Sequence, residues 1–457
     1  MAAISEAFAP VAETNLQVSR RRVIAGSTIG NALEFFDFTV FSFLMLFIGP
    51  LFFPAASAYG QLLLTTATFG VGFLMRPVGA LLIGSYADRF GRRSAMTLTL
   101  FLMGLGCGMM ALTPAYAQIG VMAPVIIVLA RLIQGFAAGG EVGAATTLLV
   151  EHAPPSQRAY YASWQFGSQS LGVFLGAIMV AALVAGLDAQ AMNEWGWRVP
   201  FFIGMLTAPV GWYIRRHLED TLVAGLPDAL SRQARERAAR SSPLRELFGQ
   251  HKLTLVKSVL LMLGAMVSTQ IIAFYMPAYA ARVLGLPTTS SLLASVVVGV
   301  VCFLLSPLVG WLADCCGRKR VILYSRLLTL AVIVPCFQWL NAAPSVTNLL
   351  LIIGLLSVLL TLQTVPGITM LPEMFPKSVR TSGMAAAYGI GVSVFGGFAQ
   401  FFVTWLLQVT EQPLAPAWYM MATVALSTLV LLWIRDRTGE DIDDTAFSRR
   451  GNASTDR

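Results

Sequence analysis

The chain alternates long apolar runs with short polar segments along most of its length. A helix that spans a bilayer needs about 20 mostly apolar residues, and twelve runs approach or exceed that length. The predicted spans cover residues 23–48, 62–86, 95–113, 121–149, 163–186, 198–214, 253–280, 290–312, 321–341, 346–371, 383–408 and 416–434. The pattern therefore predicts an all-α membrane protein with twelve transmembrane helices.

One polar insertion is much longer than the others and divides the spans into two groups of six. It carries the arginine-rich stretch SRQARERAAR, and residues 1–20 lack the apolar run and cleavage site of a signal peptide. The predicted organisation is an N-terminal tail at 1–22, a six-helix half at 23–214, a linker at 215–252, a second six-helix half at 253–435, and a C-terminal tail at 436–457.

Composition supports the membrane assignment and excludes several function classes. The chain is 56% hydrophobic and 12% charged, with a mean hydropathy of +0.71, whereas soluble proteins carry about 25% charged residues. No nucleotide loop of the GxxxxGK type and no nucleophile–base set is present, so an enzyme is not expected. The five cysteines form no CxxC or Cys/His spacing, so no metal and no cofactor is predicted.

The net charge of +8 is spread over loops rather than gathered on one folded face, so nucleic-acid binding is not expected. Cations mark cytoplasmic loops in membrane proteins. The tails, the linker and the loops after even-numbered spans are basic, while the alternate loops hold only Arg198 and Arg282. Both termini and the linker are therefore predicted to face the cytoplasm, in the cell (inner) membrane.

The two halves contain matching motifs in matching order. Residues 84–93 read GSYADRFGRR and residues 310–319 read GWLADCCGRK. Residues 151–158 and 373–380 share Glu, Pro and Arg at identical spacing. Such an internal duplication predicts two pseudo-symmetric halves with the substrate site between them, near the membrane midplane.

These motifs resemble those of the major facilitator superfamily over nearly the whole chain. Within it, GNALEFFDF (30–38), GFLMRPVGA (72–80), RLIQGFAAGGE (131–141) and WGWRVPFFIG (195–204) resemble the metabolite–proton symporters. The stretches YASWQFGSQ (161–169) and QWLNAAP (338–344) look most like the citrate and tricarballylate carriers. The resemblance implies the twelve-helix major facilitator fold, a monomer in the lipid bilayer, and symport of a small organic acid with protons.

The resemblance also implies a conformational latch in the repeated loops, holding the halves together in the outward-facing state. Its residues here are Gly84, Asp88, Arg89, Gly91 and Arg92 in the first half and Asp314 and Arg318 in the second. Cys315 stands where the first loop has Arg89, so we expect a weaker charge network in the second half.

Five ionisable residues fall inside predicted spans of the first half, where charge is costly and usually functional. They are Glu34, Asp37, Arg76, Arg131 and Glu141. Glu34 and Asp37 are three residues apart and share a helix face. Two carboxylates this close in a low dielectric do not both ionise easily, so these two and Glu141 are the proton-coupling candidates. Structural ion pairing between helices is the alternative.

Arginine keeps its charge in proteins, so Arg131 is expected to pair with a carboxylate in the empty site and with an anionic substrate in the filled one. Arg76 is a second candidate cation, although Pro77 also allows a role in a helix kink. The full set of substrate-binding candidates is Arg131, Arg76, Gln134, Gln165, Ser168, Gln169, Tyr275 and Gln363.

Each of these candidates also has a structural interpretation. The buried amides of helix five could instead hydrogen-bond another helix. Tyr279 is assigned to the interfacial belt and Arg326 is expected to snorkel to the membrane surface. Gly135, Gly139 and Gly143 indicate close helix packing.

The leading functional hypothesis is a proton-coupled importer of a small organic acid, most notably citrate or a related tricarboxylate. The alternatives are a dicarboxylate, a shikimate-like acid, or a zwitterion such as proline or betaine. The segment after Trp433 lacks heptads, unlike the coiled coil of osmosensory members. A non-transporting sensor would need a long signalling domain, and none is visible in this sequence. Drug efflux is possible on the same fold, but the Glu34 and Asp37 pair within EFFDF fits the symporters better.

Overall fold

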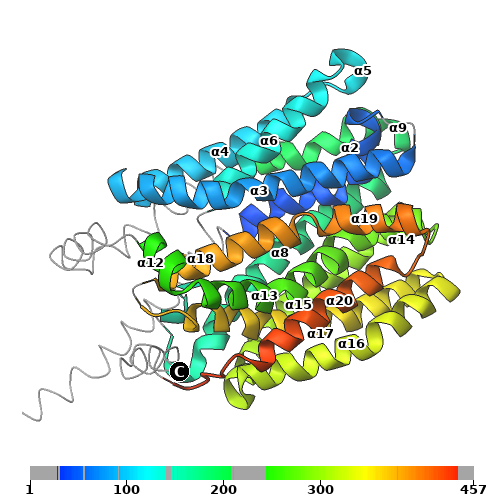
Figure 1. The fold of residues 1–457 in the computed structure, drawn as a ribbon. Coiled ribbons are helices and arrows are strands. Elements are labelled where there is room, and N and C mark those ends of the chain that lie inside the picture. The colour runs from blue at the N-terminus through cyan, green and yellow to red at the C-terminus, as the bar shows by residue number, and fades with distance from the viewer. Residues whose placement is uncertain are drawn as a thin grey trace, which may run out of the picture.

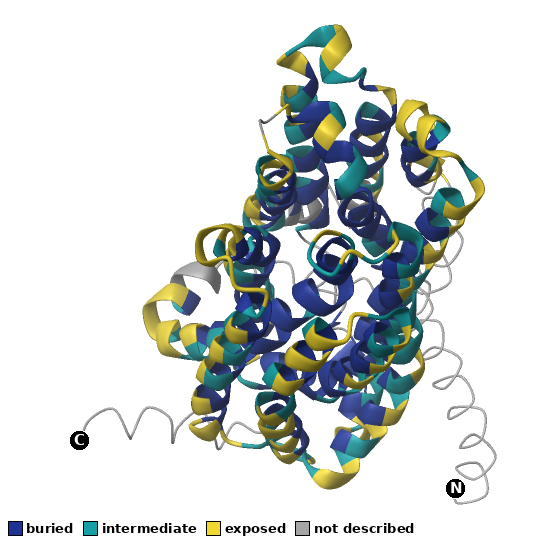
Figure 2. Cartoon of the chain, turned by 90° about the vertical axis from the view of Figure 1, so that its right-hand side faces the viewer, coloured by how far each residue is buried: buried dark blue, intermediate teal, exposed yellow. Residues whose placement is uncertain are grey.

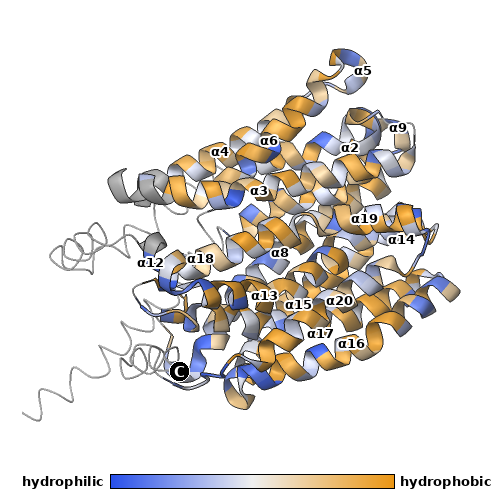
Figure 3. Ribbon diagram, in the orientation of Figure 1, coloured by the Kyte–Doolittle hydropathy of each residue, from blue (hydrophilic) through white to orange (hydrophobic). Residues whose placement is uncertain are grey.

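The computed structural model describes residues 28, 31–54, 57–90, 92–139, 146–147, 149–151, 153–206, 209, 243–377 and 379–440. Within these ranges the side chains of residues 84–85, 87–96 and 243–245 are not described. The described residues form helices and connecting loops, and most helical residues are hydrophobic (Figure 3). Many large hydrophobic side chains on the helices are exposed, among them Leu82, Phe101 and Trp311. That distribution is expected of helices that face lipid.

The first half begins with a bent pair, Asn31–Phe43 and α2 (Met45–Phe52), which meet at 61°. Its other helices are α3 (Ala58–Phe90), α4 (Arg92–Leu112), α5 (Tyr116–Ile119), α6 (Met122–Ala138), η1 (Pro155–Gln157), α8 (Arg158–Gly186), α9 (Ala189–Glu194), η2 (Gly196–Arg198) and a helix at 199–206. Pro50 lies inside α2, just after the bend at Leu44.

The second half follows α12 (Pro243–Gln250), a short helix at the end of the linker. Its spans are α13 (Lys252–Thr269) continued by η3 (Gln270–Tyr275) and α14 (Met276–Arg282), α15 (Thr288–Cys316), α16 (Arg318–Ala342), α17 (Val346–Glu373), α18 (Arg380–Gly391) continued by η4 (Val392–Gly396) and α19 (Ala399–Thr410), and α20 (Ala415–Leu432).

Eight of the described helices are long and apolar enough to cross a membrane, and the bent pair makes nine. Thr97–Leu112 and Met122–Ala138 are shorter apolar helices, and helix 199–206 runs into residues outside the description. Several helices begin earlier than hydropathy predicts, because polar residues such as Arg158, Arg318 and Arg380 end an apolar run without ending the helix.

The two halves pack side by side, with α3, α4 and α6 of the first half on one side of the molecule and α13, α16, α17 and α20 of the second half on the other (Figure 1). α8 of the first half lies along α15 of the second: a Cβ added at Gly310 would meet the carbonyl of Ala159 at 2.6 Å, and one at Gly299 would meet Phe174 at 2.7 Å. Buried residues fill the interior between the halves (Figure 2).

Close packing also fixes α3 against α6. A Cβ at Gly135 would overlap the carbonyl of Gly72, and one at Gly139 would overlap the carbonyl of Arg76. The glycine ladder predicted for this helix is confirmed at these two positions, while Gly143 lies outside the described residues. This contact places Arg76 and Arg131 on two helices that cannot move apart without opening the first half.

We call the end of the bundle that holds the α15–α16 connection at Gly317 and residues 433–440 the cation-rich end. α12 also lies at this end, while α5 and α9 lie at the other (Figure 1). The loop-motif residues Gly84, Asp88, Arg89 and Arg92 fall in α3 and α4 at this end, but their side chains are outside the description, as is Gly91 altogether.

Candidate functional site

A cavity of about 50 Å³ lies between the two halves. The residues that line it come from both halves and are Phe35, Phe38, Phe69, Phe73, Arg76, Phe166, Gln169, Met262, Ala265, Met266, Thr269, Gln270, Phe274, Thr364, Ile368, Tyr388, Val392 and Gly396. Arg76 carries the one charged side chain in this lining. Small-molecule pockets usually measure ~300–1,000 Å³, so a substrate can enter only when the surrounding helices or side chains move.

Two π-helical segments, η3 and η4, contribute to the wall through Gln270 and Gly396. Such segments interrupt the regular backbone ladder and are frequent at functional sites. They lie in helices of the second half that meet the first half across the cavity. These helices therefore have the local backbone irregularity that lets the wall of the cavity change shape.

Arg76 is buried on α3, and its guanidinium faces the cavity. Its Nη2 atom lies 3.7 Å from Oε1 of Glu34, and its Cζ atom lies 4.5 Å and 4.6 Å from the ring centres of Phe38 and Phe73. Nε and Nη2 of Arg76 have no hydrogen-bond partner within the described part of the chain. A buried arginine with unused donors is prepared to bind an anion.

Arg131 is also fully buried, but it does not reach the cavity. Its Cζ atom lies 4.7, 4.6 and 5.1 Å from the ring centres of Phe38, Phe41 and Phe69, two of which line the cavity on their other side. Phe38 therefore separates the two guanidinium groups. From the sequence we expected Arg131 to contact the substrate, whereas the structure brings Arg76 to the cavity and keeps Arg131 behind the rings.

A second polar cluster surrounds Arg131. Its Nη1 donates to Oε1 of Gln134 at 3.0 Å, and Nε2 of Gln134 donates to the sulfur of Cys107 at 3.0 Å. The Cys107 thiol in turn lies beside the carboxyl group of Asp37. A side chain at Gly204 would collide with this carboxyl group, so helix 199–206 closes the cluster from its other side.

The two carboxyl groups of the first helix thus have different environments. Glu34 lies beside Arg76 at the cavity, while Asp37 is buried in the cluster with Cys107, Gln134 and Arg131. Both Glu34 and Asp37 are almost completely buried. The third predicted carboxylate, Glu141, lies outside the described residues.

The predicted residues of helix five divide between packing and the cavity. Asn31 Nδ2 donates to Ser168 Oγ at 2.7 Å, and Gln165 Nε2 donates to Asn31 Oδ1 at 3.0 Å. Gln165 and Ser168 therefore join α8 to the first helix and are absent from the cavity lining. Gln169 does line the cavity, where its Nε2 lies 3.5 Å from the hydroxyl of Tyr388 in the other half.

The predicted contacts from the second half do not reach the cavity. The hydroxyl of Tyr275 accepts a hydrogen bond from Thr404 Oγ1 at 3.0 Å. Gln363 is buried beside the lining residue Thr364, and its Oε1 has no partner among the described residues. Neither Tyr275 nor Gln363 belongs to the cavity lining.

Two structural assignments from the sequence are wrong. Arg326 does not snorkel: it is fully buried, because backbone carbonyls of two neighbouring helices accept its hydrogen bonds, Ser427 of α20 at 2.8 Å and Leu261 of α13 at 2.5 Å. Tyr279 is not an interfacial side chain either. It is buried, and its hydroxyl donates to the carbonyl of Pro413 at 2.8 Å.

Several site residues were missed by sequence reasoning. Tyr388 and Gln270 line the cavity. Gln400 Nε2 donates to Gln270 Oε1 and to Ser42 Oγ, each at 3.2 Å. The bond to Ser42 joins the halves on the side of the cavity away from the cation-rich end. Each is a polar residue in an apolar span, so the signal used for the first half would have found them in the second. The contact of the Phe38 ring with both guanidinium groups has no sequence signal of its own.

At the cation-rich end the halves are joined by reciprocal ion pairs. Arg158 of the first half lies 3.6 Å from Glu373 of the second, and Arg380 of the second lies 3.1 Å from Glu151 of the first. These four residues are the repeated Glu and Arg of the sequence motif. The internal repeat therefore places equivalent partners across the pseudo-symmetric interface.

Asp314 completes this junction. Its carboxylate accepts the backbone N–H groups of Ala159 at 3.0 Å and Tyr160 at 2.9 Å, at the start of α8, where the helix dipole favours an anion. Arg318 pairs with Asp314 at 3.0 Å and with Glu373. The charge network forms although Cys315 is uncharged, because Arg318 supplies the cation.

Comparison with known proteins gives this arrangement its context. The family model described as Major Facilitator Superfamily matches residues 27–305, and that described as Sugar (and other) transporter matches residues 219–435. A solved structure of the proton:xylose symporter XylE, bound to 6-bromo-6-deoxy-D-glucose, superposes with a TM-score of 0.72 at 19% identity, covering 93% of this chain and 98% of that one. The predicted twelve-helix, two-half fold is confirmed.

Relatives of higher identity cover nearly the same length. A citrate-proton symporter of Salmonella typhi is 36% identical, covering 89% of this chain and 93% of that protein, and one of Klebsiella pneumoniae is 35% identical, covering 90% and 91%. A proline/betaine transporter of Escherichia coli (strain K12) is 31% identical, covering 90% and 83%. The chain is therefore a multi-pass membrane transporter, and it belongs to the major facilitator superfamily.

Proposed function

We propose that this protein is a proton-coupled symporter that imports citrate or a related tricarboxylate by alternating access. The two relatives named citrate-proton symporters are 35–36% identical over about nine-tenths of the chain. The proposal also includes the cell (inner) membrane as its location, both termini in the cytoplasm, and a monomer as the working unit.

The observation that carries the proposal is the position of Arg76. It is the one charged residue in the described lining of the cavity, and its donors are incompletely used. A permanent positive charge in a buried, largely aromatic site favours an anion strongly, because little water is present to screen the attraction. A carboxylate matches the planar fork of donors on a guanidinium group.

Proton coupling follows from the partner that Arg76 has in the empty site. Glu34 lies beside the guanidinium and competes with a substrate carboxylate for it. When Glu34 takes up a proton, it no longer neutralises Arg76, and the substrate carboxylate can replace it. Substrate binding and proton uptake then favour each other, which is the thermodynamic requirement of symport.

Asp37 supplies a second proton-binding group, and Arg131 places a permanent positive charge near it. The Asp37 cluster lies behind the Phe38 ring, away from the cavity. A proton bound there changes the charge next to Arg131 without contacting the substrate. We assign Arg131 and Gln134 to this proton side, together with Glu34 and Asp37, and Arg76 and Gln169 to the substrate side.

A zwitterion such as proline or betaine is the second candidate substrate. Phe35, Phe38, Phe73 and Tyr388 are among the rings that line the cavity, and aromatic faces bind quaternary or secondary ammonium groups by cation–π attraction. The carboxylate of a zwitterion could still pair with Arg76. The identity to a proline/betaine transporter supports this alternative.

Ligand stabilisation of the purified protein distinguishes these candidates. A ligand that binds the native state raises the melting temperature as its concentration rises. Citrate and tricarballylate should stabilise the wild-type protein, and Arg76→Ala should remove the shift while retaining the unliganded melting temperature of a folded protein. If proline or betaine stabilises the protein and tricarboxylates do not, the zwitterion assignment replaces ours.

A further inference from the structure

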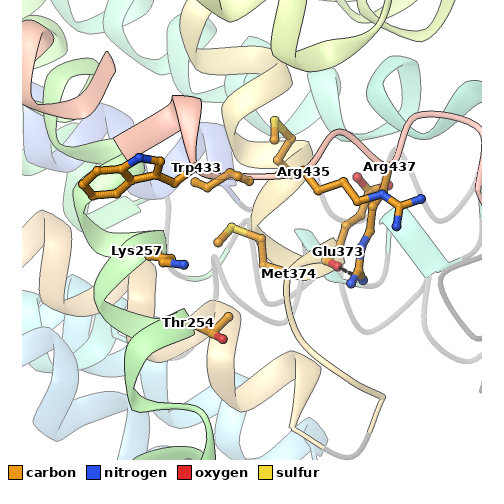
Figure 4. Close-up of a pocket in the computed structure, with 9 residues that line it drawn as sticks. Thr254, Lys257, Glu373, Met374, Trp433, Arg435 and Arg437 are labelled. Carbon is orange, nitrogen blue, oxygen red and sulfur yellow. Dashed lines mark hydrogen bonds between the residues drawn. The ribbon is translucent and has the colours of Figure 1, made fainter. Parts of the chain in front are cut away.

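A second cavity, of about 170 Å³, lies at the cation-rich end of the second half and is separate from the transport site. It is bounded by α13, by the end of α17 and by the segment that follows α20. The lining residues are Thr254, Lys257, Met370, Glu373, Met374, Trp433, Ile434, Arg435 and Arg437. Figure 4 shows Thr254 and Lys257 on one side and Trp433, Arg435 and Arg437 on the other.

The charges in this pocket favour an anion. Three of the lining residues are cations and one, Glu373, is a carboxylate. The carboxylate of Glu373 is already bound by Arg318 and by Arg158, so it does not neutralise the pocket. The lining therefore keeps an excess of positive charge although it contains an acidic residue.

The three cations are held in different ways. Nη1 of Arg437 donates to the backbone carbonyl of Glu373 at 2.8 Å, which fixes its guanidinium at the rim, and Arg435 pairs with the exposed Glu440 at 2.8 Å. Lys257 is half-buried and makes no hydrogen bond or ion pair with the residues that the structure describes. Its ammonium group is thus left to an external partner.

The surface next to the pocket is apolar. Trp433 is 76% exposed, and Leu432 and Leu429 on α20 are 51% and 58% exposed. Leu253 and Val256, next to Lys257 on α13, are exposed as well. In a membrane protein such side chains face acyl chains, and a tryptophan at a helix end marks the headgroup region.

We propose that this pocket binds the phosphate group of an anionic phospholipid. The headgroup phosphate lies against Lys257, Arg435 and Arg437, and the acyl chains run along the exposed apolar residues of α13 and α20. A lipid matches both surfaces at once, whereas a soluble phosphate would match the cations alone. Each cation near an anionic headgroup contributes about fivefold to binding.

The test measures binding of phosphatidylglycerol to the full-length protein in detergent, by native mass spectrometry across a titration. Lys257→Gln removes the charge inside the pocket, and Lys252→Gln removes an equal charge on the same helix outside it. We expect about fivefold weaker binding for Lys257→Gln, near wild-type binding for Lys252→Gln, and recovery in Lys257→Arg. A melting temperature for each variant shows that the protein is folded.

Competition identifies the source of the phosphate. Phosphatidylcholine and inorganic phosphate should each displace phosphatidylglycerol poorly, because one lacks net charge and the other lacks acyl chains. The proposal is overturned if Lys257→Gln binds phosphatidylglycerol as the wild type does, or if Lys252→Gln loses the same affinity. Equal displacement by inorganic phosphate would make the pocket a small-anion site, and equal displacement by phosphatidylcholine would remove the role of charge.

Discussion

Phe38 separates two buried arginines that the sequence presents as equivalent. Its ring centre lies 4.5 Å from Cζ of Arg76 and 4.7 Å from Cζ of Arg131. Each cation is attracted to a ring face, and the ring keeps the two positive charges apart. This single residue assigns Arg76 to the cavity and Arg131 to the cluster around Asp37.

Arg76→Lys should weaken substrate binding strongly, although the substitution keeps the positive charge. Lysine lacks the two-pronged donor that matches a carboxylate, and a lost charge-assisted hydrogen bond costs about 1.5–3 kcal/mol. We expect KM for citrate to rise by about ten- to a hundredfold, measured by initial-rate uptake. Arg282→Lys, at an exposed helix end, is the matched control, and an unchanged KM in Arg76→Lys would contradict the assignment.

The different environments of Glu34 and Asp37 predict different defects. Glu34→Gln removes the competitor of the substrate at Arg76, so citrate should bind with similar or higher affinity while its dependence on pH falls. Asp37→Asn leaves Arg76 paired, so binding should persist while accumulation against a gradient is lost and exchange of labelled citrate survives. Identical pH profiles for both variants and the wild type would show that neither carboxyl group couples transport to protons.

At the scale of elements, the contact between α3 and α6 positions both arginines. Gly135 faces the carbonyl of Gly72 with no room for a side chain. Gly135→Val should separate these helices and destabilise the protein by at least ~1–3 kcal/mol, the usual cost of overpacking. Denaturation in detergent measures this, and Gly389→Val, where the surroundings are open, should have a much smaller effect.

The junction at the start of α8 predicts a conformational defect. Asp314→Asn keeps the shape of the side chain but weakens its bonds to Arg318, Ala159 and Tyr160. A contact made in one state biases the equilibrium by its differential energy. The variant should open more often at the cation-rich end, as single-cysteine accessibility would report.

The order of substrate preference should not change in Asp314→Asn, because the residue lies away from the cavity lining. Competition uptake measures that preference. A changed order with unchanged accessibility would place Asp314 in the substrate site instead of the junction.

Helices and their order are predictable because long apolar runs have few alternatives in a membrane. The cross-half partners follow from the repeat, since Glu151 and Glu373 occupy equivalent positions and so do Arg158 and Arg380. The roles of Gln165 and Ser168 were not predictable, because their partner Asn31 lies on another helix whose rotation is set by packing. The rotation of α3 and α6, which packing also sets, decides which arginine faces the cavity.

At the scale of the whole molecule, the halves touch on both sides of a small cavity. Arg158 and Glu373 join them at the cation-rich end, and Ser42 and Gln400 join them on the other side. In this arrangement the cavity is closed on both sides, which is the occluded state of a transporter. Transport requires each set of contacts to break in turn, so each must contribute only modest energy.

Uptake by reconstituted protein tests the central claim of proton-coupled citrate import most directly. Proteoliposomes with an alkaline interior should accumulate labelled citrate above its external concentration, and a protonophore should abolish the accumulation. Arg76→Ala proteoliposomes should show background uptake. Citrate uptake that equilibrates without responding to the pH gradient, or no citrate uptake by protein that accumulates proline, would contradict the account.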